Sequence, residues 1–499
     1  MFKNYFKMKL IKKQYSIGFL LFCLLLGTSC KVFAPIKNKY NAIQKDLTPV
    51  QAKYNKQMPG SFNESEDTTN SATISWKDFF EDKNLVNLID TALNNNIDLL
   101  MTLQDIEIAR NNVKIKHSLI LPYTTAGINV GGEKVGRYTS QGAGDASAEI
   151  TPGKIVPEIL GDYFIGIHSS WEIDVWQKLR NAKKAAFTKY LSSIEGRNFV
   201  ITNLVAEIAN SYYELLSLDN QLDIIRETIK LQQNALEIVK VQKEAARETE
   251  LGVKKFEAEV LNSQSLEFDI LQNIKENENK INFLLGRFPQ PIIRDKSSLI
   301  VDQLRVIKDG IPSQLLVNRP DVKQAELELF ATDCNVRIAK AEFYPSFNIS
   351  GSAGFQAFKP RFLLRIPESL LLSLAGDLAA PIINRKAIEA EFSNAKLEQI
   401  NAMYDYQKSI LTGYVEVSNE LSNISNLGKL FDMKNKEVEA HVQAIELSND
   451  LFKYGRADYF EVLLTQRDAL ASKLELIETK KRQFIAVTNL YKALGGGWR

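Results

Sequence analysis

Histidine and cysteine, which most often carry catalysis or bind transition metals, are few in this chain and far apart. The histidines are His117, His168 and His441, and no Cys and His residues have the spacing of a metal site. No glycine-rich, phosphate-binding loop joins a strand to a helix. The sequence therefore predicts no catalytic residue, no metal and no cofactor.

A second candidate site is the stretch from residue 452 to residue 464, which contains two acidic residues. Gly455 separates two helical patterns there, and Asp458 and Glu461 stand three residues apart, on one face of the second helix. By their pattern alone, such acids are explained as solvated side chains at a helix surface.

The elements that position these residues occur twice. Asn112-Val113-Lys114-Ile115 followed by Pro122 reappears 223 residues later, as Asn335-Val336-Arg337-Ile338 followed by Pro345. Arg180 and Phe187 return as Arg385 and Phe392 at an offset of 205, and Phe256-Glu257 returns as Phe460-Glu461 at an offset of 204. A duplication of this length indicates two copies of one structural unit. The change of offset places a longer loop, residues 137–157, in the first copy.

The N-terminus has the order of a secretory signal. Five lysines precede an apolar run from Ile17 to Leu26, and small residues then lead to Cys30. A cysteine in this position resembles that of a bacterial lipoprotein, although Leu26 lies four places before the cysteine instead of the usual three. We predict a signal peptide over 1–29 and lipidation of Cys30. The alternative is a plain cleaved signal peptide with an incidental cysteine.

Charge and cysteine content exclude two further possibilities. Without residues 1–29 the chain has 57 basic and 60 acidic residues, so its near-neutral charge argues against nucleic-acid binding. Only Cys30 and Cys334 remain, and lipidation of the first would preclude an intramolecular disulfide.

Proline positions indicate very long helices. None of the 14 prolines lies between Glu158 and Phe288 or after Ile382. Within the first of these windows apolar residues recur at heptad spacing, which predicts helices packed as coiled coil. The residues of this pattern are Leu215, Leu222, Ile229 and Leu236, with Leu218, Ile225 and Val239 between them.

Four other segments alternate between apolar and polar residues with a period of two. They are predicted as strands at about 122–136, 160–176, 345–358 and 361–380, and His168 falls among the polar residues of the second. Alternation of this kind is typical both of a transmembrane β-barrel and of a half-buried soluble sheet. In lipid, four strands cannot close a barrel, so a transmembrane sheet requires oligomerisation, and a trimer would supply twelve strands.

Four further motifs follow one another along the chain: Trp76 to Leu93, Trp171 to Gln177, Gly310 to Glu326 (including Asn318-Arg319-Pro320-Asp321-Val322) and Leu490 to Trp498. In this order they resemble the motifs of one family, the TolC-like outer membrane efflux factors, in particular their lipoprotein (NodT/OprM-like) branch. The resemblance covers residues 76–498.

The resemblance implies a mainly α protein with transmembrane β structure. It would be a homotrimer with four strands per chain in a 12-stranded outer-membrane β-barrel, on a long periplasmic α-helical barrel. Its partners would be outer-membrane lipid, a periplasmic adaptor and an inner-membrane RND-type transporter. Such a protein is a passive exit duct for drugs or other small molecules. A duct for type I protein secretion and a lipid-anchored periplasmic coiled-coil adaptor are the alternatives.

The family's periplasmic gate matches the stretch around Gly455. In related channels, acidic side chains ring the constriction at two positions after the glycine, three residues apart. Glu461 matches the first position and Leu464 the second, so the resemblance implies a more apolar constriction to which Asp458 could add charge.

The expected organisation follows from the repeats and the resemblance. After the signal peptide come a lipid anchor and extended leader (30–75), repeat 1 (76–286, long helices from about 181), an equatorial linker (287–320), repeat 2 (321–494, long helices from about 384) and a tail (495–499).

Overall fold

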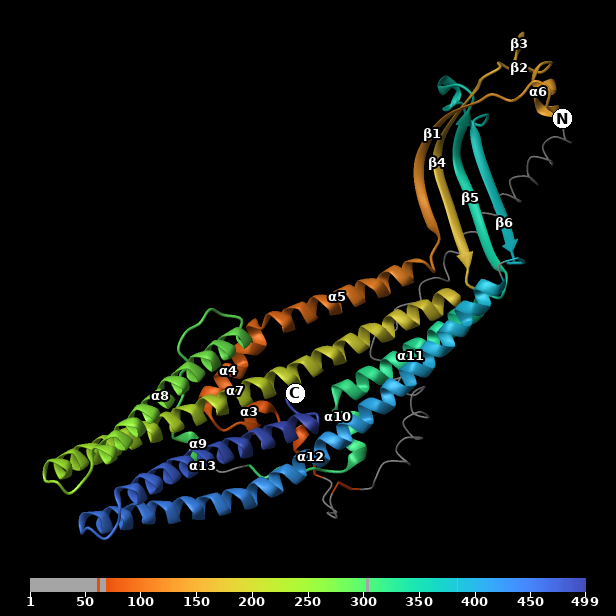
Figure 1. The fold of residues 1–499 in the computed structure, drawn as a ribbon. Helices are drawn as coiled ribbons and strands as arrows, with labels where there is room; N and C mark the ends of the chain where they lie inside the picture. The colour runs from red at the N-terminus through yellow and green to blue at the C-terminus, as the bar shows by residue number, and fades with distance from the viewer. Residues whose placement is uncertain (1–60, 63–68, 302–304, 384) are drawn as a thin grey trace. The chain divides into compact units, whose positions relative to one another are not determined.

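The computed structural model describes residues 61–62, 69–301, 305–383 and 385–499. The predicted signal peptide, Cys30 and most of the predicted leader lie outside the described residues. The described residues belong to one unit, residues 59–499, and repeat one order of elements (Figure 1). Each copy has a helix, two strands, a long helix and a shorter helix, which confirms the predicted duplication.

The corresponding elements have similar lengths in the two copies. The first copy contains α5 (Ile97–Ser118), β1 (Tyr123–Glu133), β4 (Leu160–Ile173), α7 (Lys178–Glu244) and α8 (Glu250–Leu284). The second contains α11 (Pro320–Ala341), β5 (Ser346–Ala357), β6 (Leu370–Ala379), α12 (Arg385–Lys453) and α13 (Tyr459–Ala493). Shorter elements are η1 (Ser71–Thr73), α3 (Trp76–Phe79), α4 (Lys83–Asn95), α6 (Ser140–Asp145), β2 (Glu149–Thr151), β3 (Lys154–Ile155), α9 (Ser298–Val301), η2 (Pro312–Gln314), α10 (Leu315–Asn318) and η3 (Pro360–Phe362).

Proline determines where the helices end and how long they become. Helices α5 and α11 stop just before Pro122 and Pro345, because proline cannot continue the hydrogen-bond ladder. In the proline-free windows α7 and α12 run for 67 and 69 residues, or roughly 100 Å each. None of the helices in the described part of the chain is both long enough and apolar enough to cross a membrane.

The predicted heptad pattern of α7 is buried against its neighbours. All seven apolar residues of the pattern are buried, mainly in clusters that include residues of α8. Gln232 occupies the one polar position of the same stripe. Its side chain is 1% exposed, and neither its nitrogen nor its oxygen has a hydrogen-bond partner among the described residues.

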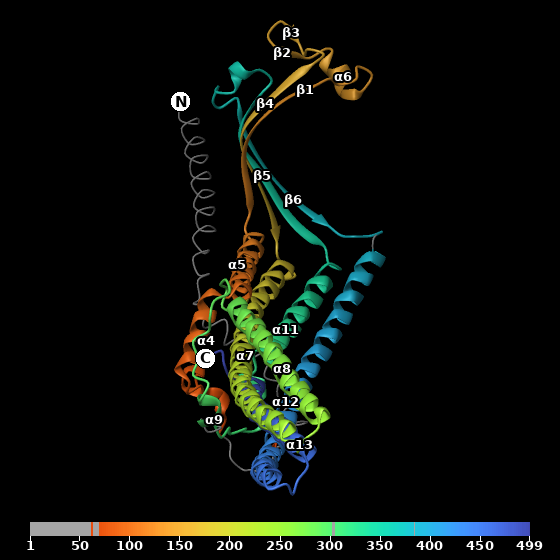
Figure 2. The ribbon, with the colours of Figure 1, turned by 60° about the vertical axis from the view of Figure 1, so that its left-hand side comes forward.

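The four long strands form one antiparallel sheet in the order β1-β4-β5-β6. The register aligns Ile128, Ile165, Phe355 and Leu370 in one row across all four strands. The structural bounds of each strand lie within its predicted range. Figure 2 shows the sheet extending from the ends of α5, α7 and α11.

The short N-terminal helices and the linker between the repeats pack on the long helices. Trp76, Phe79, Ile292 and Leu299 share one buried core with residues of α7 and α13. In this core the rings of Tyr491 and Phe79 stack with their centres 3.8 Å apart. Burial raises the pKa of Tyr491 to about 12. The end of the predicted extended leader is folded: it forms η1, where the Ser71 amide donates to the Lys308 carbonyl of the linker (2.9 Å).

Candidate functional site: a polar sheet face and two helix tips

One face of the sheet is polar along most of its length. His168, Ser352 and Ser373 form one cross-strand row, and His168 Nδ1 lies 3.0 Å from the Ser352 hydroxyl. A second row, nearer the helices, contains Glu172, Asn348 and Asp377. The register therefore places His168 on a continuous polar surface, which is the predicted side of its strand.

The opposite face is apolar, and both outer strands have an unpaired edge. This face carries, among others, Ala126, Ile128, Ile165, Ile167, Phe347, Phe355, Leu370, Leu372, Leu374 and Leu378. Among the described strands, β1 pairs only with β4 and β6 pairs only with β5. A sheet whose edge groups remain unpaired is incomplete in lipid, because no water is available there to satisfy them.

Two helices carry apolar stripes that no described part of the chain covers. Met101, Ile108 and Ile115 recur every seven residues on α5, and each is more than half exposed. The buried residues of α5, Leu99 and Ile106, lie two positions before the first two of them and so on the opposite side of the helix.

The stripe on α12 likewise consists of exposed apolar residues opposite the buried side of the helix. Leu397, Tyr404 and Leu411 recur every seven residues and are more than half exposed. Ala395 and Tyr406, two positions away, are buried on the opposite side of the helix. Each stripe has the heptad period of a helix that packs against a second helix.

Gly455 lies two residues after Lys453, the last residue of α12. Its φ of +71° is accessible to glycine at little cost, and its amide donates to the Phe452 carbonyl (3.0 Å). The Arg456 amide donates to the Leu451 carbonyl at 2.8 Å. These two bonds form a Schellman motif, which satisfies the last carbonyls of the helix and reverses the chain into α13.

The three predicted gate residues lie at the start of α13 with different surroundings. Asp458 is the N-cap residue, and its Oδ1 accepts a hydrogen bond from the Phe460 amide (3.1 Å). Glu461 is exposed in the first helical turn, where the helix dipole favours a negative charge, and Leu464 is half-buried. The carboxylate of Asp458 thus caps the helix, while that of Glu461 faces solvent in the single chain.

The turn between α7 and α8 in the first repeat has no glycine in the left-handed position. It also shows that one predicted alignment of the two repeats is wrong. Ala246 has a φ of +56° and occupies the place of Gly455, while Thr249 caps α8 as Asp458 caps α13. Both pairs are 209 residues apart. The predicted correspondence of Phe256-Glu257 with Phe460-Glu461, at 204, is therefore wrong at this point, because the hairpin turns place Gly252 opposite Glu461.

Replacing Ala246 by glycine is expected to stabilise the first hairpin tip. A side chain in the left-handed region costs about 1 kcal/mol that glycine avoids. In Ala246→Gly, the amides at the end of α7 should exchange hydrogen several-fold more slowly. Gly455→Ala should have the opposite effect at the second tip, and equal exchange in both variants and the wild type would contradict the prediction.

The two tips contact each other through residues that the sequence analysis did not identify. Lys255 Nζ of α8 lies 4.9 Å from the centre of the Phe460 ring and 6.0 Å from that of Tyr459. A Cβ at Gly252 would come within 3.6 Å of the Tyr459 ring. Between the hairpins lies a cavity of about 490 Å³, with apolar walls that include Ile238, Phe256, Ile445, Phe452 and Leu470. No spacing in the sequence predicts these contacts, since they join separate helices.

Arg319, in the motif between the repeats, is buried among groups from three helices. Its guanidinium, 5% exposed, donates to the Asp321 carboxylate (3.0 and 2.7 Å), to Glu416 of α12 (2.7 Å) and to the Ala493 carbonyl at the end of α13 (2.8 Å). Burial opposes the charge, but the bonds to Asp321 and Glu416 outweigh it and raise the pKa of Arg319.

The same site joins two motifs that are distant in the sequence. Trp498 Nε1 donates to the Asn318 carbonyl (3.2 Å), and Arg499 donates to the Asn318 side-chain oxygen (3.0 Å). Gly495 has a φ of +92°, and a Cβ there would lie 2.6 Å from the same carbonyl. The glycine-rich C-terminal motif is thus shaped to pack on the motif that starts the second repeat.

This arrangement of sheet and long helices is that of a solved membrane protein. A crystal structure of a membrane protein from Pseudomonas aeruginosa superposes with a TM-score of 0.80 at 24% identity, covering 88% of this chain and 98% of that one. The likeness to this structure concerns the fold.

The chain belongs to the outer membrane efflux protein family, which it matches over residues 88–287 and 311–496. The toluene efflux pump outer membrane protein TtgF of Pseudomonas putida is 27% identical over 91% of this chain and 93% of its own length. The pyoverdine export outer membrane protein OpmQ of Pseudomonas aeruginosa is 26% identical over 96% of both chains. The protein is an efflux protein of the outer membrane.

Proposed function

We propose that three copies of this chain form a passive exit duct with a 12-stranded barrel. The unpaired edges of β1 and β6 carry this proposal, because lipid tolerates no open sheet edge. Pairing β6 of one copy with β1 of the next removes both edges. Three copies then give a closed barrel of twelve strands, a number within the range of outer-membrane barrels. The apolar face would then contact lipid, and His168 and its polar row would line the lumen.

The helix stripes support the same assembly. A head-to-tail contact between α5 of one copy and α12 of the next would cover both stripes. Such a heterologous contact closes into a ring when repeated by rotation. The helices would then form a tube that continues the barrel into the periplasm.

The N-terminal expectations are part of this proposal. Residues 1–29 would be removed as a signal peptide, Cys30 would carry lipid, and the leader up to residue 75 would connect the anchor to the helices. The basic, apolar and small residues before Cys30 support this order. Residues 76–286 and 321–494 would be the repeats, with the equatorial linker 287–320 between them and the tail 495–499 at the end.

The proposed partners are a periplasmic adaptor and an inner-membrane RND-type transporter that supplies the energy. The chain itself would catalyse no reaction. One relative is named for a toluene efflux pump and the other for pyoverdine export. These names favour small molecules over proteins as the cargo, and we propose drugs or other small organic molecules.

The periplasmic gate is proposed at the start of α13. Three copies of Glu461 near the axis would favour cations, and Leu464 one turn later would narrow the passage by apolar contact. Asp458 would contribute less charge, because its carboxylate caps the helix.

Conductance of purified trimers in planar bilayers tests the duct and the gate together. The wild type should conduct with a preference for K⁺ over Cl⁻, and Glu461→Ala should lower this preference roughly twofold or more. Glu257→Ala removes one acid from the other hairpin, where Glu257 pairs with Lys254, and as a charge control it should leave the selectivity unchanged. Folded protein that neither conducts nor runs as a heat-modifiable trimer would overturn the duct. A conducting trimer whose selectivity is insensitive to Glu461 would overturn only the gate.

A further inference from the structure

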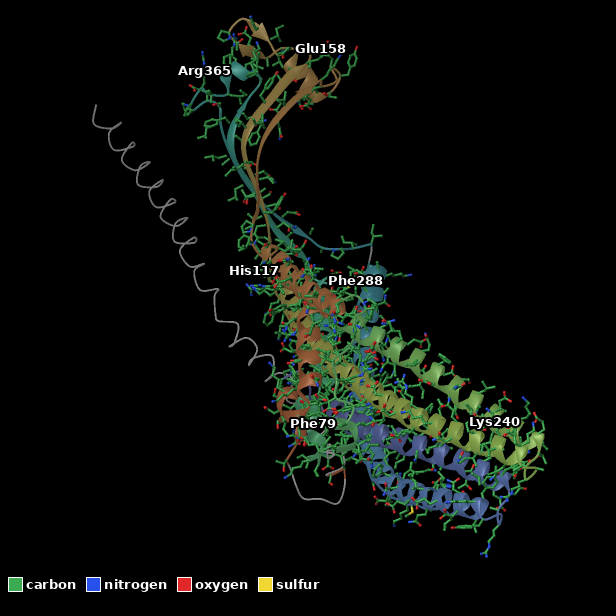
Figure 3. All side chains as sticks on the ribbon, turned by 90° about the vertical axis from the view of Figure 1, so that its left-hand side faces the viewer. Phe79, His117, Glu158, Lys240, Phe288 and Arg365 are labelled. Carbon is green, nitrogen blue, oxygen red and sulfur yellow. The ribbon has the colours of Figure 1, made fainter. Side chains whose placement is uncertain are left out.

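The connection between β5 and β6, residues 358–369, concentrates positive charge on aromatic rings. Arg361 and Arg365 lie over the same Phe362 ring, with their guanidinium carbons 4.6 and 5.2 Å from its centre. Lys359 Nζ lies 5.8 Å from the centre of the Phe358 ring. Three cations are therefore held at one end of the sheet, and Figure 3 shows Arg365 there together with Glu158 of the other connection.

These cations have no carboxylate partner in the described part of the chain. None of its ion pairs includes Lys359, Arg361 or Arg365. The one acid of the segment, Glu368, is exposed. By contrast, Lys134 in the other connection lies 3.6 Å from Glu158. Two guanidinium groups that lie over one ring and pair with no acid among the described residues are preorganised to bind phosphate oxygens.

The backbone holds the cations in place. The Phe362 amide donates to the Lys359 carbonyl (3.0 Å), and the Arg365 amide donates to the Phe362 carbonyl (3.0 Å). The buried Ser369 donates to the Arg365 carbonyl through both its amide (2.9 Å) and its hydroxyl (2.6 Å). The charged segment is thus an ordered turn, so little conformational entropy would be lost when it binds a ligand.

Large exposed apolar side chains lie next to the same cations in the sequence. Leu364 is 81% exposed and Ile366 is 67% exposed, and the next strand carries Leu370, Leu372 and Leu374 on the apolar face. Apolar residues at such exposure are unfavourable in a water-filled lumen and favourable beside acyl chains. Cations next to an apolar strand face complement a molecule with phosphate groups and fatty-acyl chains.

We propose that residues 358–369 bind a phosphorylated glycolipid, the diphosphoryl lipid A class of the outer leaflet. Arg361 and Arg365 contact its phosphates, and Leu364, Ile366 and the leucines of β6 contact its acyl chains. The inference rests on the proposed function, which places this end of the sheet at the outer leaflet. Lipid bound on each copy would surround the outer rim of the trimer.

The test measures binding of the full-length detergent-solubilised trimer to phosphatidylcholine liposomes with and without diphosphoryl lipid A. The double variant Arg361→Gln/Arg365→Gln should bind the lipid A liposomes at least roughly tenfold more weakly, because two charge-assisted contacts are lost. Arg137→Gln/Lys154→Gln removes two charges from the other connection and should bind like the wild type. Phe362→Leu keeps the charges without the ring and should bind with intermediate affinity.

A gel of unheated protein first verifies that each variant is a trimer. Equal binding by the wild type and Arg361→Gln/Arg365→Gln would overturn the lipid proposal, as would equal binding to lipid A from which both phosphates have been removed. Absence of a trimer in the wild type would instead overturn the proposed function.

Discussion

Arg319→Met should destabilise each subunit by about 3–5 kcal/mol, the usual cost of removing one partner from a buried ion-pair network. Methionine keeps much of the side-chain volume but leaves the Asp321 carboxylate and the Ala493 carbonyl without their donor. Glu416 is 44% exposed and partly regains water, so the loss falls mainly on the other two groups. The thermal unfolding midpoint, followed by circular dichroism on the same detergent-solubilised sample, measures the change.

Two comparisons separate the role of the network from that of charge alone. Arg337→Met removes an arginine on the same helix whose pair with Asp333 is solvated, and it should change stability by less than about 1 kcal/mol. Arg319→Lys keeps the charge but not the forked donors, so it should lie between the wild type and Arg319→Met. Equal midpoints for Arg319→Met and Arg337→Met would contradict a stabilising role for the buried site.

Ile108→Glu combined with Ile115→Glu should abolish the trimer. Each isoleucine in the proposed α5–α12 contact contributes about 1.5–3 kcal/mol by burial, and a carboxylate in its place would have to be desolvated without a partner. The contact occurs three times per ring, so the penalties add across the assembly. Light scattering of the purified protein should report a single chain, and the trimer band should be absent from an unheated gel.

The matched control keeps the stripe apolar. Ile108→Leu combined with Ile115→Leu preserves volume and hydrophobicity and should leave the trimer intact. Both residues lie opposite the buried side of α5, so the glutamate variant should retain the helical circular dichroism of the folded chain. A stable trimer of the glutamate variant would show that α5 does not form the contact between subunits.

Local chemistry made much of the fold predictable from the sequence. The absence of proline over long windows and its presence after α5 and α11 fixed where helices could run and where they had to stop. The period-two alternation assigned His168 and the leucines of β6 to opposite faces of the sheet, because successive side chains in a strand point to opposite sides. Gly455 was predictable as the hairpin turn because a left-handed residue at a helix end is most often glycine.

Contacts between separate elements were not predictable in the same way. The turn at Ala246 carries no glycine, so sequence matching placed the two copies of the hairpin five residues out of register. The pairing of Lys255 with Phe460, the Arg319 network and the two arginines on Phe362 depend on which elements become neighbours, and spacing along the chain does not encode this.

The sequence by itself determined the duplicated order of helices and strands and the faces of each strand, because these follow from the periodicity and backbone limits of consecutive residues. The family was indicated by the order and spacing of its motifs. Only the tertiary structure decided that Asp458 caps a helix while Glu461 remains exposed, and that α5 and α12 carry apolar stripes that none of the described residues covers. These features arise when helices distant in sequence pack together, and packing decides which side chains find partners and which remain available.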